Sequence, residues 1–365
     1  MKSKGRNLYI DALTYQKKKA YGYNEYLFNL LNYFLEKRDE IKFEKIIIVC
    51  EKSQKEDFVR FSDKMEILTF SFSNILKRMW VQGLWNFFIP VRRNDVILST
   101  ANYSTFFKRS KHLLVIHDLL YLHSDWLKSK KIRYQRRLMI PRSIRMADKI
   151  IAISDFTKDQ VIDSFPYSQE KIETVYNYFN FEKFGDIEFK LKKENNIISV
   201  ASKDFHKNTI TILRGFYQYK IRGGRMNLVM IGGLRVGSEE QYLFDRVIQE
   251  FPGSIECKSG ISNSELAMEY GKSSVYVSAS FFEGLGMPIV EAMFFGLILV
   301  LPKEPAVFKE VSSNMAIYFD SRDPDELTSI FLSCEKKMDS KPQYDTDRFN
   351  ASKTSGKYVS ILNDI

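Results

Sequence analysis

Short runs of apolar, often β-branched residues recur along the chain and alternate with segments of helical periodicity. In several runs the apolar residues are consecutive, which is typical of parallel strands covered on both faces. Leu27, Leu30, Leu31 and Phe34 instead follow the i, i+3, i+4, i+7 spacing of an amphipathic helix. The predicted strands are 8–12, 46–50, 96–99, 113–116, 149–153, 197–201, 227–231, 275–279 and 297–301. This alternation predicts α/β units with right-handed crossovers.

A polar stretch without strong periodicity, residues 177–196, separates the two series of predicted strands. The length of 365 residues also suits two domains, at roughly 100–200 residues per domain. We therefore expect two facing, doubly wound Rossmann-like domains, residues 1–180 and 181–343, and a C-terminal helix in 344–365 that packs back on the first domain. Because ligands of such sheets bind at the carboxyl ends of the strands, an interdomain cleft is the expected active site.

Composition narrows the class of protein. The chain is 44% hydrophobic and 27% charged, which suits packed cores and excludes a disordered or collagen-like chain. No apolar run approaches the ~18 residues of a membrane-spanning helix, and the basic start is not followed by a secretory apolar region. Cys50, Cys257 and Cys334 lie far apart, so neither a disulfide framework nor a zinc site is predicted. We expect a cytoplasmic protein.

The net charge of +10 is carried by the first half of the chain. Residues 1–180 contain 32 Lys and Arg against 20 Asp and Glu, and the remaining residues contain 23 against 25. Such an imbalance favours an anionic partner, which could be nucleic acid, a phosphate-bearing substrate or an acidic membrane surface.

The most informative segment is 280–296, which runs from a predicted strand into a helix that begins at Pro288. Gly284 and Gly286 precede this helix, and glycines there let backbone N–H groups approach an anionic ligand that the helix dipole favours. Glu283 and Glu291 flank the same turn, with Glu291 pointing away from the packed face of the helix. A carboxylate can accept two hydrogen bonds from a sugar or ribose diol.

This segment resembles the E-x7-E signature of the retaining, group 1 (family 4-like) glycosyltransferases, which have the GT-B fold and use nucleotide-sugar donors. Other segments resemble the family in the same order, so that the resemblance spans about residues 8 to 325. They are the glycine loop at 20–26, a His-Asp-Leu element at 116–119, the approach to the interdomain connection at 147–154 and 171–177, and the first element of the donor domain at 199–208.

The resemblance implies roles for individual residues. Glu283 would contact the transferred sugar, Lys207 would stabilise the leaving diphosphate, and His117 would contact the sugar from the opposite domain. Glu291 would bind the ribose hydroxyls. The other implied donor-binding positions are Gly284, Leu285, Gly286, Met287, Pro288, Ser202, Lys203, Gly232, Gly260, Ile261 and Gly22. The family often has an arginine near 202 or 203, where Lys203 supplies the charge but not the planar fork.

The reaction that the resemblance implies is the transfer of a hexosyl unit, for example mannose, from a GDP- or UDP-linked sugar. The acceptor would be a glycan or a polyprenyl-diphosphate-linked sugar in the synthesis of cell-surface polysaccharide, such as lipopolysaccharide or capsule. The family needs no metal or other cofactor. Accordingly, the strings Asp323-Pro-Asp325 and Asp345-Thr-Asp347, which follow no buried strand, are not predicted to hold one.

Two other functions stay open. A GT-B phosphorylase would carry pyridoxal phosphate, but the chain is short for one and shows no lysine signature for that cofactor. A nucleic-acid-binding α/β protein would interleave basic and aromatic residues, whereas the densest basic cluster, residues 128–145, contains Tyr134 as its single aromatic residue. With Trp126 and the segment 77–80, this cluster could instead dock at the inner face of the cytoplasmic membrane. The alternative is that the cluster is simply the solvated face of a helix.

Overall fold

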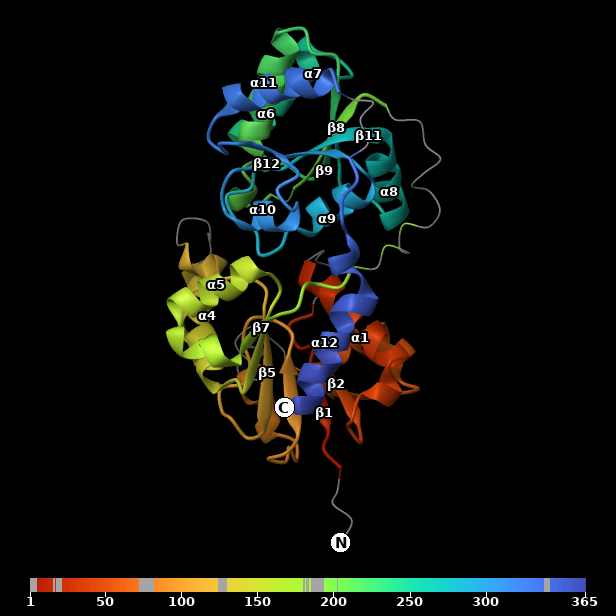
Figure 1. Cartoon of the computed structure of the whole chain (residues 1–365), viewed down its shortest axis with the longest axis vertical. Coiled ribbons are helices and arrows are strands. Elements are labelled where there is room, and N and C mark those ends of the chain that lie inside the picture. The colour runs from red at the N-terminus through yellow and green to blue at the C-terminus, as the bar shows by residue number, and fades with distance from the viewer. Residues whose placement is uncertain are drawn as a thin grey trace. The chain divides into compact units, whose positions relative to one another are not determined.

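The chain folds into two compact units, each built on one parallel sheet with helices packed against it (Figure 1). The first unit comprises Met1–Phe179 and Arg348–Ile365, and the second comprises Asn180–Asp347. The computed structural model describes residues 5–15, 17, 22–71, 82–123, 130–179, 181, 184, 194–201, 203–337 and 342–365. The predicted α/β class with two Rossmann-like sheets is confirmed.

The first unit has a seven-stranded sheet in the order β3-β2-β1-β4-β5-β6-β7. Its strands are β1 (Leu8–Asp11), β2 (Ile46–Glu51), β3 (Glu66–Phe70), β4 (Val96–Ser99), β5 (Lys111–Ile116), β6 (Lys149–Ala152) and β7 (Ile172–Thr174). The helices with described bounds are α1 (Gly22–Glu36), α2 (Lys55–Phe58), α4 (Lys130–Met146), α5 (Asp155–Ser164) and α12 (Ala351–Asp364).

Helix α12 completes the first unit, although it follows the second unit in the chain. Its Tyr358 ring meets Phe34 of α1 edge-on at 5.8 Å, and its hydroxyl lies 3.3 Å from that of Tyr26. Arg6, just before β1, donates to the carbonyl oxygen of Asn363 at 2.7 Å. The last helix is thus held by both α1 and the start of the sheet.

The second unit has a six-stranded sheet in the order β10-β9-β8-β11-β12-β13. Its strands are β8 (Asn196–Ala201), β9 (Asn227–Gly232), β10 (Ile255–Lys258), β11 (Ser273–Val277), β12 (Ile298–Pro302) and β13 (Ile317–Phe319). Its helices are α6 (Thr209–Ile221), α7 (Glu239–Glu250), α8 (Asn263–Lys272), α9 (Met287–Phe294), α10 (Val307–Val311) and α11 (Pro324–Glu335).

The four strands that the hydrophobic pattern did not predict are β3, β7, β10 and β13, and each is an edge strand of its sheet. An edge strand has one neighbour and more contact with solvent, so it tolerates polar residues and a shorter apolar run. In β10, for example, Ile255 is buried while Glu256 is exposed. The nine predicted strands are all central, because the pattern of consecutive apolar residues detects burial on both faces.

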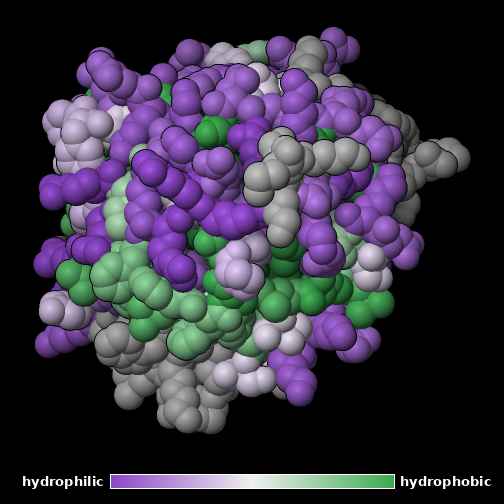
Figure 2. Space-filling model, turned by 90° about the horizontal axis from the view of Figure 1, so that it is seen from below, coloured by the Kyte–Doolittle hydropathy of each residue, from purple (hydrophilic) through white to green (hydrophobic). Residues whose placement is uncertain are grey.

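A group of exposed rings and arginines lies on the first unit, and we call Phe87, Phe88, Phe107, Arg109 and Arg142 the aromatic–arginine patch. The Phe87 and Phe107 rings meet edge-on at 5.4 Å, and Phe88 is 65% exposed. The guanidinium of Arg109 lies 4.8 Å above the Phe87 ring, and that of Arg142 lies 5.6 Å from the Phe107 ring. Seen from below the view of Figure 1, apolar residues form a band across the surface, with hydrophilic residues along one side of it (Figure 2).

In the part of the chain that the structure describes, no helix has both the length and the apolar character needed to cross a bilayer.

Candidate active site

The E-x7-E segment forms the turn between β11 and α9. Gly286 caps α9 with a positive φ of 86°, and a Cβ there would lie 2.8 Å from the Ile289 side chain, so both backbone and space favour glycine. Pro288 lies in the first turn, and α9 begins one residue earlier than predicted, at Met287. The remaining predicted residues of this turn are Gly284 and the buried Leu285. The first turn of α9 therefore starts directly after the glycine loop.

Glu291 is buried within the unit, with 4% of its surface exposed. The hydroxyl of Tyr270, on α8, donates to Glu291 Oε2 at 2.8 Å, and the Tyr270 ring stacks on Phe295 at 5.4 Å. The carboxylate is therefore not a solvated surface group, because one of its two oxygens accepts a hydrogen bond from a hydroxyl on the neighbouring helix. Tyr270 is a residue of this site that sequence reasoning missed, since it belongs to no motif.

Lys207 and Glu283 form one ion pair. Lys207 ends a short 3-10 helix after β8, and its Nζ donates to Glu283 Oε1 at 2.6 Å. The two side chains are 19% and 16% exposed. The resemblance implies separate partners for them, the diphosphate and the sugar, whereas in the structure they contact each other.

Backbone and amide hydrogen bonds tie the loops that carry this pair. The Phe281 amide donates to the His206 carbonyl oxygen at 2.7 Å. Asn208, in the left-handed conformation with φ of 49°, donates through Nδ2 to the carbonyl oxygens of Ala279 at 3.0 Å and Ser321 at 2.6 Å. The closeness of Lys207 and Glu283 therefore follows from the fold of the two loops.

The carboxylates of Glu283 and Glu291 both influence the pKa of one buried phenol, that of Tyr276 on β11. Burial, and then the charges of Glu283 and Glu291, raise the pKa of Tyr276 well above its usual value. The charges of both carboxylates therefore reach Tyr276.

Lys203 follows β8, and Gly232 ends the neighbouring strand β9. Gly232 ends β9 with a φ of 130°, and a Cβ on the next residue, Gly233, would lie 2.7 Å from Lys203 Cε. Lys203 and Gly233 line a small hollow with Asp204, Thr209, Leu234, Arg235 and Glu240. The lysine stem therefore lies directly over the glycine turn. Ser202 falls outside the described residues.

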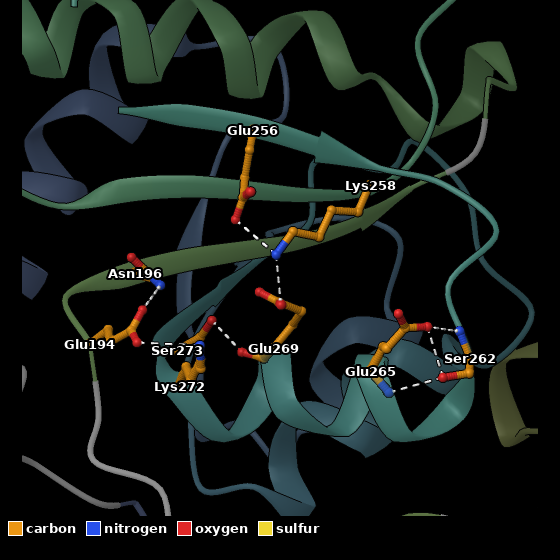
Figure 3. Close-up of polar contacts among 9 residues, drawn as sticks. All are labelled: Glu194, Asn196, Glu256, Lys258, Ser262, Glu265, Glu269, Lys272 and Ser273. Carbon is orange, nitrogen blue, oxygen red and sulfur yellow. Dashed lines mark hydrogen bonds and ion pairs between the residues drawn. The ribbon is translucent and has the colours of Figure 1, made fainter. Parts of the chain in front are cut away.

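The loop after β10 contains Gly260, with a φ of 68°, and Ile261. It leads into a capping box at the start of α8, where the Ser262 amide donates to Glu265 Oε2 at 2.7 Å and the Glu265 amide donates to Ser262 Oγ at 3.2 Å (Figure 3). Just before the loop, Lys258 pairs with Glu256 at 3.0 Å and with Glu269 at 2.7 Å. The loop is thus held at both ends.

These loops meet at one edge of the sheet. Gly260 follows β10, Gly232 ends β9, Lys203 and Lys207 follow β8, and Glu283 follows β11. The sheet order β10-β9-β8-β11 makes these four strands consecutive neighbours, and all are parallel. Since the carboxyl ends of parallel strands lie at the same edge, this arrangement forms a row of glycine turns and lysines that ends at a carboxylate.

His117 belongs to the first unit, directly after β5. Its Nε2 lies 2.7 Å from the carbonyl oxygen of Thr100, which can only accept, so Nε2 carries the hydrogen. The His117 amide donates to Asn102 Oδ1 at 2.6 Å, and the Tyr26 ring meets the imidazole edge-on at 4.8 Å. Burial lowers the pKa of His117, which keeps the ring neutral. Asn102, with a φ of 46°, is a second residue that sequence reasoning missed.

Gly22 and His112 belong to the first unit, and Asp323 belongs to the second. Gly22 is the first residue of α1, whereas 20 and 21 lie outside the described residues. His112 is buried, with Nδ1 3.0 Å from Ser104 Oγ. Asp323 caps α11 by accepting from the amides of Asp325 and Glu326, as the turn before a helix predicts. Across the described ranges, no three His, Cys, Asp or Glu side chains are grouped to hold a metal ion.

Two family models match the chain in succession. The model described as Glycosyltransferase Family 4 matches residues 22–183, and that described as Glycosyl transferases group 1 matches residues 180–341. The O-antigen chain mannosyltransferase RfbU of Salmonella typhimurium is 23% identical over 303 residues, which cover 80% of this chain and 82% of the relative. The O-antigen chain mannosyltransferase B of Escherichia coli is 21% identical over 249 residues, 65% of each chain.

Solved structures show the same fold. Anabaena HepE in complex with UDP-glucose superimposes with a TM-score of 0.72 at 14% identity, covering 99% of this chain and 100% of that one. The lipopolysaccharide outer core galactosyltransferase WaaB, in its apo form, gives a TM-score of 0.65 at 15% identity, covering 98% and 99%. Together with the two family models, the paired sheets and the glycine-rich turns identify the chain as a member of the group 1 glycosyltransferases of the GT-B fold.

Proposed function

We propose that this glycosyltransferase moves a hexosyl unit, for example mannose, from a GDP- or UDP-linked sugar to a glycan or polyprenyl-diphosphate-linked acceptor in cell-surface polysaccharide synthesis. The row of glycine turns, lysines and carboxylates along four consecutive strands of the second unit carries this proposal. The names of the two O-antigen mannosyltransferases and of the lipopolysaccharide galactosyltransferase support the choice of a hexose and of a polysaccharide.

Each proposed role matches the chemistry of the side chain. Lys207 and the N–H groups at the start of α9 bind the diphosphate, because both present positive charge to an anion. Glu291, fixed by Tyr270, accepts the ribose hydroxyls, and Glu283 accepts hydroxyls of the sugar. His117 holds its Nε2 hydrogen toward Thr100, which leaves Nδ1 as the acceptor for a sugar hydroxyl.

The proposed reaction retains the configuration at the anomeric carbon and uses no metal ion. The bond from that carbon to the diphosphate oxygen breaks as positive charge develops on the sugar ring, and Lys207 stabilises the negative charge on the leaving group. The acceptor hydroxyl attacks from the face that the diphosphate leaves, and a phosphate oxygen takes its proton. The acceptor oxygen thereby gains the glycosidic bond without a protein side chain acting as base.

A thermal-shift and turnover screen of nucleotide sugars tests this function. We expect a GDP- or UDP-linked hexose and its nucleoside diphosphate to raise the melting temperature, because a ligand at about 100 times its Kd stabilises a protein by about 2.7 kcal/mol. The matching nucleoside, which lacks the diphosphate, serves as the control and should give no shift. A screen in which no nucleotide sugar or diphosphate raises the melting temperature would contradict the proposal.

A lipid-linked acceptor would also require contact with a membrane, and we propose that the first unit supplies it. The aromatic–arginine patch combines exposed rings with guanidinium groups, and the adjoining helix α4 exposes Tyr134 and Leu138. Apolar rings insert at the boundary of headgroups and acyl chains, and each Lys or Arg near an anionic surface contributes about 1 kcal/mol. Arg136 is turned toward Asp118, at 3.9 Å, and the predicted contributors 77–80, 126 and 128 lie outside the described residues.

Phe88→Asp should weaken binding to phosphatidylglycerol vesicles by about tenfold, because it removes a side chain whose burial contributes about 1.5 kcal/mol or more. Co-sedimentation at low and high salt measures the effect. Tyr242→Asp is the matched control, since Tyr242 is a similarly exposed ring of the second unit, at 68%. Equal loss in both variants, or equal binding to neutral vesicles, would argue against the patch as the docking surface.

A further inference from the structure

The donor site contains an ion pair that its proposed ligand must open. Lys207 Nζ and Glu283 Oε1 are 2.6 Å apart, and less than a fifth of either side chain is exposed. Because the hydrogen bonds of Asn208 and Phe281 hold the two loops together, the charges stay near each other when the pair opens. Any anion that reaches Lys207 therefore also reaches the neighbourhood of the Glu283 carboxylate.

The intact nucleotide sugar and the product nucleoside diphosphate differ in the contacts that they make with Lys207 and Glu283. The inference rests on the proposed function, in which the diphosphate contacts Lys207 and the sugar contacts Glu283. A nucleotide sugar replaces both halves of the pair, since its diphosphate takes the ammonium and its hydroxyls donate to the carboxylate. A nucleoside diphosphate replaces only the carboxylate partner of Lys207. The Glu283 carboxylate then has lost its hydrogen bond from Lys207, and the diphosphate brings further negative charge close to it. Both effects are unfavourable where solvent is largely excluded.

We propose that Glu283 selects the intact donor over the product and helps to release the product. While the sugar is bound, Glu283 accepts its hydroxyls and Lys207 is available to the diphosphate. After transfer, the sugar has left with the acceptor, and the carboxylate competes with the nucleoside diphosphate for the ammonium of Lys207. Re-forming the ion pair then restores the arrangement seen in this structure.

The experiment compares nucleoside diphosphate affinity in wild type, Glu283→Gln and Glu283→Ala. Titration calorimetry with UDP and GDP should show about tenfold tighter binding in both variants, equivalent to about 1.4 kcal/mol, although a residue proposed to contact the sugar has been removed. Two substitutions are used, and the melting temperature of each is recorded, so that a folding defect in one does not decide the result. Equal or weaker binding of both diphosphates in the folded variants would overturn the proposal.

Glu269→Gln is the matched control. Glu269 forms a comparable pair with Lys258 at 2.7 Å in the same unit (Figure 3), and no ligand-binding role is proposed for it. Its diphosphate affinity should equal that of wild type, and a gain as large as in Glu283→Gln would overturn the proposal.

Turnover separates this inference from the proposed function. If wild type turns over a nucleotide sugar while the Glu283 variants bind its diphosphate no more tightly, this inference alone fails. If neither wild type nor variants bind any nucleotide sugar or nucleoside diphosphate, the proposed function fails with it.

Discussion

Replacing Lys207 with alanine is expected to lower the turnover number for glycosyl transfer by about 10³-fold. The proposed transition state places negative charge on the leaving diphosphate, and removing one preorganised donor to such a charge typically costs about 10²–10³-fold in rate. Lys207 is in addition a charged donor whose side chain is only 19% exposed, which favours the upper end of this range. Steady-state kinetics with the donor identified in the screen measures the effect.

The control for this variant separates charge from folding. Lys207→Ala leaves the Glu283 carboxylate without its cation, which should cost about 1–3 kcal/mol of stability. The double variant Lys207→Ala, Glu283→Gln removes both charges and should regain most of the melting temperature while transfer stays low. Recovery of transfer in the double variant would show that Lys207 serves only to neutralise Glu283.

Glu291→Gln is expected to raise the Kd for the nucleoside diphosphate about 100-fold, equivalent to about 2.7 kcal/mol. A hydrogen bond to a charged group contributes about 1.5–3 kcal/mol, and the proposed ribose contact uses the charged carboxylate. Glutamine keeps an oxygen that can accept from Tyr270, so the buried hydrogen bond and the fold should persist. Calorimetry together with the melting temperature checks both statements.

A ligand that lacks the ribose hydroxyls provides the matching test. Dideoxy nucleoside diphosphates should bind wild type about as weakly as the complete nucleotide binds Glu291→Gln. In Glu291→Gln, removing the ribose hydroxyls should weaken binding little further, because the effects of changing two groups in direct contact are not additive. Additive losses would place the ribose elsewhere in the site.

The central parts of both sheets could be predicted from the sequence, and the edges could not. Strands such as β2 and β12 are buried on both faces, so most of their residues form continuous apolar runs. The four edge strands carry polar residues or are only three residues long, as in β7 and β13, and leave no such run. The hydrophobic pattern thus records how deeply a strand is buried.

The candidate site was predictable where it depends on local backbone. The turn at Gly286 and a helix start near Pro288 follow from neighbouring residues; the structure has the turn and begins the helix at Met287, one residue before Pro288. Tyr270 and Asn102 were missed because each acts through a residue distant in sequence, and a tyrosine or asparagine alone signals nothing. The Lys207–Glu283 pair was missed because it joins residues 76 positions apart, and the motif assigns each of them to a ligand rather than to the other.

The return of α12 to the first unit sets an order of assembly during synthesis. The second unit is one uninterrupted segment, Asn180–Asp347, and has all its residues once that segment has left the ribosome. The first unit starts earlier but lacks Tyr358 and Leu362, which are buried in it, until the residues after Asp347 have been added. The unit that begins first is therefore completed last, and a fragment ending at Phe179 would display the side of α1 that α12 covers.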